Sequence, residues 1–327
     1  MTTAEPIAGS PAVLSGSATA APAISVQGLR MSYGNYEAVR GIDLEVARGE
    51  ILAFLGPNGA GKTTTTEILE GFRMRTAGDV QVLGTDPAKG GSGWRARIGV
   101  VLQTCAPERM LSVRECLTMY AGYYPKPLGV QRALELTGLT EKAGTRCDQL
   151  SGGQQRRLDV ALALIGDPEL IFLDEPTTGF DPTARRQAWD VISGLRDLGK
   201  TVFLTTHFMD EAEALADRIM ILAAGKIVAS GTPQTIGGRS AGATVISFSL
   251  PEGVAHGDVP SLPGQLEAPA VTAHAAHGRV EIEVSEPVPA LHALSGWATE
   301  RRLALPDITV NRPSLEDIYL KLTASSH

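Results

Sequence analysis

Three short groups of residues in this chain combine glycines, charges and hydroxyls at spacings suited to chemistry. The first is Gly56-Pro57-Asn58-Gly59-Ala60-Gly61-Lys62-Thr63, which fits G-x-x-x-x-G-K-[ST]. Its glycines let backbone N–H groups converge on phosphate oxygens, and the predicted following helix adds its positive N-terminal end. This phosphate loop places Lys62 to reach the β- and γ-phosphates and the Thr63 hydroxyl to bind magnesium.

The second group is a pair of carboxylates, Asp174 and Glu175, directly after the apolar run Leu170-Ile171-Phe172-Leu173. The run predicts a buried strand, whose C-terminal end would hold both carboxylates beside the nucleotide. Asp174 suits a magnesium ligand, directly or through water, and Glu175 suits a general base that polarises the attacking water. The alternative is a solvated acidic pair that only ends a buried strand.

The third group is Ser151-Gly152-Gly153-Gln154, which begins another predicted helix. A serine and two glycines at a helix N-terminus make a second anion-binding nest. The alternative is a plain helix cap with Ser151 as the N-cap, which explains the serine but not the two glycines.

The elements around these groups predict an α/β protein. Residues 50–55 form a predicted strand before the phosphate loop, and a helix continues through Leu69, the context that the loop requires. Residues 107–149 show helical periodicity and no β-rich runs, which indicates a helical subdomain. Strands and helices then alternate, which favours a parallel sheet covered on both faces.

Composition divides the chain into three parts. Residues 1–23 are rich in small residues and are expected to be a disordered tail. Residues 24–237 hold all three groups. Residues 238–327 contain strand-like runs separated by Pro and Gly, and predict a small α+β module with a last helix over 314–322. One interpretation of that run is a generic amphipathic helix that packs on the module's own sheet. We therefore expect residues 24–237 to fold and bind nucleotide without the module.

Bulk properties exclude several classes of protein. The net charge of −7 disfavours a nucleic-acid binder, and the three scattered cysteines indicate a reducing compartment without a disulfide framework. No run reaches about 18 apolar residues, and the N-terminus lacks the basic region of a signal peptide. We expect no covalent membrane anchor, so any membrane-spanning work belongs to another polypeptide.

The chain resembles the ATP-binding-cassette (ABC) ATPases over roughly residues 24–236, because three motifs follow in their order. These are a phosphate loop, the signature Leu150-Ser151-Gly152-Gly153-Gln154, and a strand that ends in Asp-Glu. The resemblance implies a cassette with a mixed sheet core, an antiparallel β subdomain and a helical subdomain. It also implies that Ser151 and Gly153 bind the γ-phosphate of ATP held by a second copy of the chain. ATP and Mg²⁺ are then the cofactors, and ATP joins a head-to-tail homodimer.

The resemblance assigns further residues one by one. Gln103 matches the glutamine that contacts magnesium or water and relays nucleotide state to the membrane partner. His207 matches the histidine that bonds the γ-phosphate, and Asp181 matches the aspartate at the dimer interface. Tyr33 is expected to stack on adenine, although Tyr36 nearby is an alternative. The implied ATP contacts are Tyr33, Gly56, Pro57, Asn58, Gly59, Ala60, Gly61, Lys62, Thr63 and Thr64.

Two segments resemble one branch of this family, the drug-export ATPases of the daunorubicin-resistance type. They are Leu69-Glu70-Gly71-Phe72-Arg73 and the C-terminal run from Asn311 to Leu320. The resemblance implies a subunit at the cytoplasmic face of the cell membrane that energises efflux through a separate six-helix permease. The alternatives are an importer ATPase and a non-transport ABC ATPase that acts on ribosomes or DNA; the single cassette, without a long insertion between phosphate loop and signature, disfavours the latter.

Overall fold

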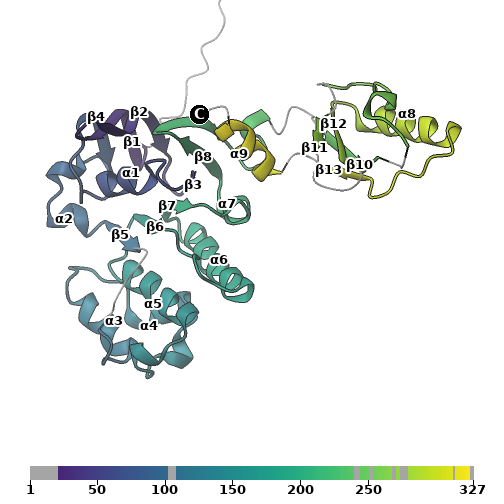
Figure 1. The fold of residues 1–327 in the computed structure, drawn as a ribbon. Coiled ribbons are helices and arrows are strands. Elements are labelled where there is room, and N and C mark those ends of the chain that lie inside the picture. Colours follow the sequence, from purple (N-terminus) through teal and green to yellow (C-terminus); the bar gives the residue numbers. More distant parts are fainter. Residues whose placement is uncertain are drawn as a thin grey trace, which may run out of the picture.

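The structure is a computed structural model, and it describes residues 21–101, 108–238, 244–250, 253–266, 270–272, 279–311 and 314–324. The chain is an α/β protein with two sheets in the larger part and a third sheet in the C-terminal part (Figure 1). The predicted fold class, an ABC-type cassette followed by an α+β module, is confirmed. Gln103 lies outside the described residues.

A six-stranded mixed sheet forms the centre of the cassette. Its order is β5 (Ile98–Val101), β6 (Leu170–Asp174), β7 (Thr201–Thr206), β3 (Ile51–Leu55), β8 (Arg218–Ala223) and β9 (Lys226–Gly231). The first five strands are parallel and β9 pairs antiparallel to β8. All five residues of β3 are fully buried, as expected for a parallel strand covered on both faces. The C-terminal ends of β6, β7 and β3 therefore meet at one edge of the sheet.

A second, antiparallel sheet lies beside the first, in the order β2 (Tyr36–Val46), β1 (Ile24–Tyr33) and β4 (Ala77–Val82). β1 and β2 form a hairpin whose last pair is Tyr33 opposite Tyr36. One hydrophobic core joins the two sheets through side chains such as Val26, Leu44 and Phe54. The hairpin is thereby fixed over the helix that follows the phosphate loop.

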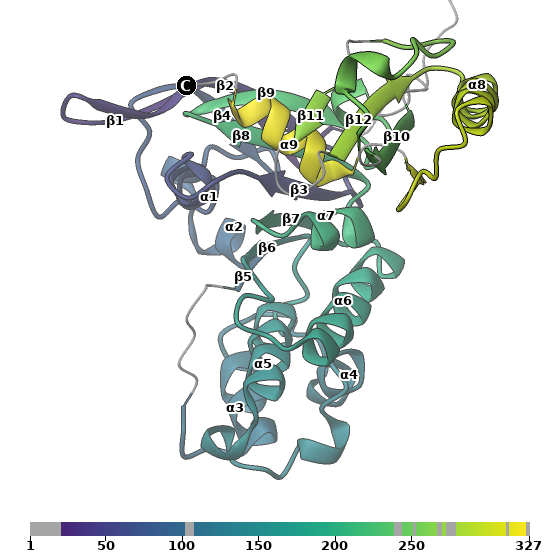
Figure 2. The same cartoon turned by 45° about the vertical axis from the view of Figure 1, so that its right-hand side comes forward.

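Helices cover the central sheet and build a separate helical subdomain (Figure 2). They are α1 (Lys62–Leu69), α2 (Ser92–Arg95), α3 (Val113–Ala121), α4 (Val130–Leu136), α5 (Gly152–Leu164), α6 (Pro182–Asp197) and α7 (Met209–Leu215), with short 3₁₀ turns η1 (Pro87–Lys89), η2 (Thr140–Lys142), η3 (Cys147–Gln149) and η4 (Ile236–Gly238). The core of the subdomain contains Val113, Leu117 and Leu134 from α3 and α4, and Leu158 from α5. α5 thus connects this subdomain to the sheet, since Val160 and Leu164 pack under β6.

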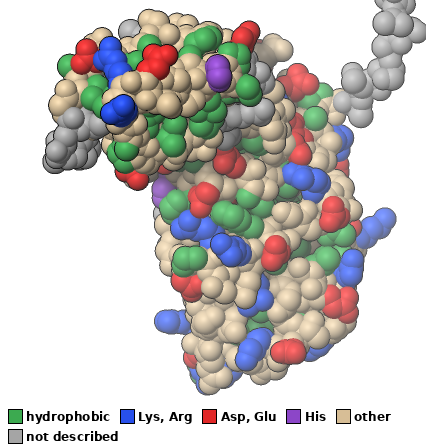
Figure 3. Space-filling model, turned by 90° about the vertical axis from the view of Figure 1, so that its right-hand side faces the viewer, with side chains coloured by type: hydrophobic (Ala, Val, Ile, Leu, Met, Phe, Trp, Pro, Cys, Tyr) green, Lys and Arg blue, Asp and Glu red, His purple; other side chains and the backbone are tan. Residues whose placement is uncertain are grey.

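The C-terminal part has its own four-stranded antiparallel sheet, in the order β11 (Ala270–Thr272), β12 (Arg279–Val284), β10 (Thr244–Ser249) and β13 (Thr309–Asn311). The helix α8 (Pro287–Glu300) covers one face of it, and η5 (His256–Asp258) precedes β11. Alternate residues Ile246, Phe248, Val280 and Ile282 face α8 and are buried with Leu294. Figure 1 shows this sheet and α8 to the side of the cassette, and on the face drawn in Figure 3 charges of both signs are interspersed.

The last helix, α9 (Leu315–Ala324), packs on the cassette and not on the module's own sheet. Leu315 is 1% exposed and shares a core with Ala53 of β3, Ala212 of α7 and Ile236. Gly237 has a φ of 61°, and a Cβ there would lie 2.2 Å from Ile318 Cγ2, so glycine is needed for this close approach. The expectation that this helix packs on the module's own sheet is wrong, because an amphipathic pattern does not specify its partner.

A chain truncated near residue 237 should be less stable than the sequence alone indicates, because the cut also removes α9 from the cassette core. We expect Leu315→Ala to lower the free energy of unfolding of the cassette by about 2–5 kcal/mol, the usual cost of emptying a buried leucine site. Leu320, 57% exposed on the same helix, provides the matched control, and Leu320→Ala should change stability by no more than about 0.5 kcal/mol. Hydrogen exchange in β3 and α7 measures the effect, and unchanged protection there with Leu315→Ala would contradict the assignment of α9 to the cassette.

Candidate nucleotide-binding and hydrolytic site

The phosphate loop connects the C-terminal end of β3 to α1, as its sequence predicts. Gly61 is the N-cap of α1 with a φ of 107°, and a Cβ there would lie 2.6 Å from the carbonyl oxygen of Ala38. Only glycine fits this position, because the backbone is left-handed and β2 passes directly beside it. The loop therefore exposes backbone N–H groups at a helix N-terminus, which is an anion site.

Lys62 is folded into this loop. Its side chain is 6% exposed, and its Nζ donates to the carbonyl oxygens of Gly56 at 2.7 Å and Pro57 at 3.3 Å. The nearest carboxylate oxygen with which it forms an ion pair, Glu175 Oε1, is 4.0 Å away. Burial lowers the pKa of Lys62, and the charges of Glu175 and Asp174 oppose that shift. A buried cation held mainly by neutral carbonyls fits a loop that binds an anion.

Asp174 and Glu175 lie at the end of β6, next to the end of β7. Thr205 of β7 donates its hydroxyl to Asp174 Oδ1, and the backbone N–H of Glu175 donates to the Thr205 carbonyl at 3.0 Å. Glu175 has a φ of 44°, a left-handed conformation that costs a non-glycine residue of order 1–3 kcal/mol. Neighbouring hydrogen bonds hold this strained residue in place, which is typical of functional positions.

His207 faces the Glu175 carboxylate, with His207 Nδ1 3.3 Å from Glu175 Oε1. The approach is close but lacks hydrogen-bond geometry, so the buried Nδ1 atom has no hydrogen-bond partner among the described residues. Thr178 donates its hydroxyl to the other carboxylate oxygen of Glu175 at 3.3 Å. The structure thus brings Lys62, Asp174, Glu175 and His207 from three parallel strand ends into one cluster, as the sequence predicts.

Tyr33 lies at the end of β1, and its hydroxyl is 3.4 Å from the Thr64 hydroxyl on α1. The Tyr33 side chain is exposed, and the Arg73 guanidinium lies 5.3 Å from its ring centroid. Tyr36, its partner in the hairpin, is also exposed. The contact with Thr64 places Tyr33 over the helix of the phosphate loop and favours it as the residue that stacks on a base.

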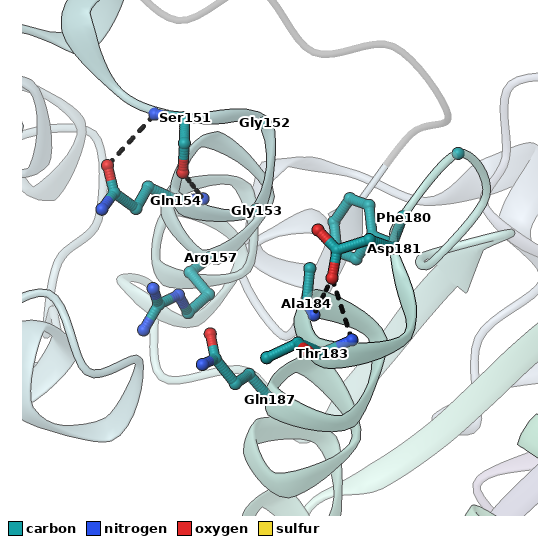
Figure 4. A pocket seen from close by; sticks show the side chains of 11 residues that line it. Ser151, Gly152, Gly153, Gln154, Arg157, Phe180, Asp181, Thr183, Ala184 and Gln187 are labelled. Atoms are coloured by element: carbon teal, nitrogen blue, oxygen red, sulfur yellow. Dashed lines mark hydrogen bonds between the residues drawn. The ribbon is translucent and has the colours of Figure 1, made fainter.

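The second predicted anion nest begins α5. Ser151 is the N-cap: its hydroxyl accepts from the Gln154 N–H, and the Gln154 side chain accepts from the Ser151 N–H (Figure 4). This capping box satisfies two helix N–H groups. Asp181 caps the facing helix α6 by accepting from Thr183 and Ala184, each at 2.9 Å. Ser151 is therefore a helix cap, as the alternative interpretation predicts. A cap alone does not account for the hollow in front of it.

That hollow is lined by both helix N-termini and the loop before α6. The lining residues are Ser151, Gly152, Gly153, Gln154, Arg157, Gly179, Phe180, Asp181, Thr183, Ala184 and Gln187. In Figure 4 the side chains of Arg157 and Gln187 point toward one another across it. None of the phosphate-loop residues is among the lining residues. The nest at the phosphate loop and the nest at Ser151 therefore open at two different positions on this chain.

Two residues beside the site were not predicted from the sequence. Arg156, 7% exposed on α5, donates to the carbonyl oxygens of Asp174 and Pro176, each at 3.0 Å, and so ties the signature helix to the carboxylate loop. Glu70 is 4% exposed at the end of α1, and no residue that the structure describes bonds its Oε1. Burial raises the pKa of Glu70 to about 8, and the negative charges of Asp174 and Glu67 add to the shift. The Glu70 carboxyl therefore holds its proton more firmly than a solvent-exposed glutamate does.

Comparison with known proteins identifies the family. Residues 39–178 match the ABC transporter family model, and residues 244–314 match the C-terminal domain of ABC transporter domain-containing proteins. Daunorubicin resistance ATP-binding protein DrrA3 of Streptomyces coeruleorubidus is 35% identical over 92% of this chain and 96% of its own length. Nod factor export ATP-binding protein I of Rhizobium meliloti (strain 1021) is 39% identical over 92% of this chain and 88% of its own.

Solved structures agree with this result. A dimeric ATP-binding cassette in a post-hydrolysis state with ADP and phosphate superposes with a TM-score of 0.57, at 24% identity, over 64% of this chain and 98% of its own. The chain belongs to the ABC transporter family. It is an ATP-binding and ATP-hydrolysing cassette protein, as its motifs predict.

Proposed function

We propose that this chain is the ATPase subunit that energises export of a drug-like or amphiphilic compound through a separate membrane permease. The names of its relatives, one for daunorubicin resistance and one for Nod factor export, support export, and the similarity extends over the C-terminal module as well as the cassette. None of the helices in the described ranges combines the length and apolar composition needed to cross a bilayer. Because the relatives are named as ATP-binding proteins of export systems, we assign the membrane passage to a partner and place this chain at the cytoplasmic face.

Each site residue has a role in this proposal. Lys62 and the N–H groups of the loop from Gly56 to Thr64 bind the ATP phosphates, and Tyr33 stacks on adenine. Thr63 and Asp174, with Gln103 from the resemblance, would hold Mg²⁺, which would offset charge on the β- and γ-phosphates. Glu175 accepts a proton from the attacking water, and His207, 3.3 Å away, orients Glu175 and contacts the γ-phosphate.

The separation of the two nests is the observation that carries the ATPase part of the proposal, in which two chains share each ATP. The hollow at Ser151 and Gly153 is lined without any residue of the phosphate loop, which supports two nests that serve different nucleotides. We infer that two chains associate head to tail, so that Ser151, Gly152, Gly153 and Gln154 of one chain meet ATP on the phosphate loop of the other. Asp181, which lines the same hollow, then lies at the dimer interface. A related cassette has been solved as a dimer with ADP and phosphate.

Purification from host membranes tests the export assignment. Affinity-tagged chain extracted in mild detergent should retain one membrane protein with several hydrophobic spans. ATP hydrolysis by that complex should depend on Glu175. Recovery of the chain only with ribosomes or DNA, and with no membrane protein, would contradict the proposal.

A further inference from the structure

A buried carboxyl group on α7 contacts the segments that carry the hydrolytic residues. Glu211 is fully buried, and its Oε1 accepts from the Thr177 hydroxyl at 2.8 Å and from Trp189 Nε1 at 3.2 Å. Burial raises the pKa of Glu211, and the polar groups of Thr206, Thr177 and Trp189 act to lower it, as does the charge of Arg185. Within the described parts of the chain, Glu211 Oε2 has no hydrogen-bond partner. A buried carboxyl with three polar neighbours is costly to disturb.

These neighbours come from three different parts of the site. Thr177 is two residues after Glu175, and Thr206 immediately precedes His207. Trp189 belongs to α6, the helix that Asp181 caps at the signature hollow. A single side chain therefore links the Glu175 loop, the His207 segment and the helix at the proposed dimer interface.

Arg185 makes a second contact between α6 and the His207 segment, through the ring of Phe208. The Phe208 ring lies 4.1 Å from the His207 ring, centroid to centroid, and the Arg185 guanidinium lies 4.3 Å from the Phe208 centroid. Arg185 of α6 also pairs with Asp210 at 3.2 Å. Both contacts fix the start of α7, which carries Glu211, against α6.

We propose that Glu211 is a positioning residue for ATP hydrolysis that sets the spacing of Glu175 and His207. The inference rests on the proposed role of Glu175 as general base. It follows from two observations: Glu175 has a left-handed backbone that must be held by its surroundings, and its 3.3 Å approach to His207 has no hydrogen bond of its own. Glu211 bonds Thr177, close to Glu175 in sequence, and belongs to the helix that begins two residues after His207, whereas the phosphate loop lies at the end of another strand.

Steady-state kinetics and nucleotide binding test this inference. Glu211→Leu should lower kcat at least about tenfold, because small displacements of reacting groups are costly. The Kd for ATP should stay within about threefold, because the binding loop is untouched. Glu211→Gln keeps an acceptor oxygen and should restore most of kcat. Thr177→Val removes one donor and should lower kcat in the same direction, while Thr137→Val, a buried threonine in the helical subdomain, should have no effect on kcat.

A double-mutant cycle distinguishes positioning from general damage. In a Glu175→Gln background, Glu211→Leu should cause little further loss, because it acts through the residue already removed. Full additivity of the two losses, or a parallel fall in ATP affinity and melting temperature for both Glu211→Leu and Thr177→Val, would overturn the inference. If Glu175→Gln itself retains wild-type turnover, the proposed function fails instead, so the two failures are separable.

Discussion

Glu175→Gln is expected to abolish most ATP turnover while leaving ATP binding intact. The amide has the shape of the carboxylate but cannot accept the proton of the attacking water, so kcat should fall by about 10² or more, the usual contribution of a general base. Lys62 and the loop N–H groups are unchanged, so the Kd for ATP should remain near that of the natural chain. Phosphate release measures turnover, and equilibrium binding of labelled ATP measures affinity.

The matched control for this variant is a second acidic residue of the same neighbourhood that lies outside the proposed chemistry. Asp190 is exposed on α6 and takes no part in the contacts described above, and Asp190→Asn should leave turnover nearly unchanged. Turnover near the natural rate in Glu175→Gln would remove Glu175 as the base. A fall of similar size in ATP affinity would instead indicate that Glu175 shapes the binding loop through its 4.0 Å approach to Lys62.

Mixing two inactive variants should restore part of the activity. One chain carries Lys62→Ala, which damages its phosphate loop. The other chain carries Ser151→Ala, which damages the nest that it presents to the ATP of its partner. If the sites are shared, each heterodimer holds one intact site and one doubly damaged site. An equal mixture should then contain intact sites at about a quarter of the natural number. Activity should rise above both variants alone and be highest near equal proportions.

The same mixture has a built-in control, because heterodimer formation is measured directly with two different tags. Lys62→Ala mixed with a second phosphate-loop variant, Thr63→Ala, should give no recovery, since each heterodimer then lacks an intact loop in both sites. Heterodimers without recovery in the Lys62 and Ser151 pair would show that each chain completes its own site.

The sequence predicted those parts of the site that are set by local chain geometry. A strand followed by a glycine-rich loop and a helix fixes Lys62, and an apolar strand fixes Asp174 and Glu175 at its end. Because β3, β6 and β7 are parallel neighbours, their ends meet, and the cluster with His207 follows from the topology alone.

Contacts between distant parts of the chain could not be predicted in this way. Arg156 bonds carbonyl groups 18 and 20 residues away, and Glu211 meets Thr177 across 34 residues, neither of which has a spacing pattern. The backbone conformation of Glu175 is likewise invisible in a residue list. The partner of α9 could not be predicted either. Its apolar face predicts that the helix is buried, but not that the cassette core buries it.

The mass of the Glu175→Gln chain in solution tests the central claim most directly, which is that two chains share each ATP. Without nucleotide the chain should sediment as a monomer, and saturating ATP with Mg²⁺ should convert it to a dimer that persists because hydrolysis is blocked. Adding Ser151→Ala to the same chain should weaken that dimer, since the nest toward the partner's γ-phosphate is impaired. A chain that binds ATP fully and remains a monomer over the whole concentration range would contradict the account.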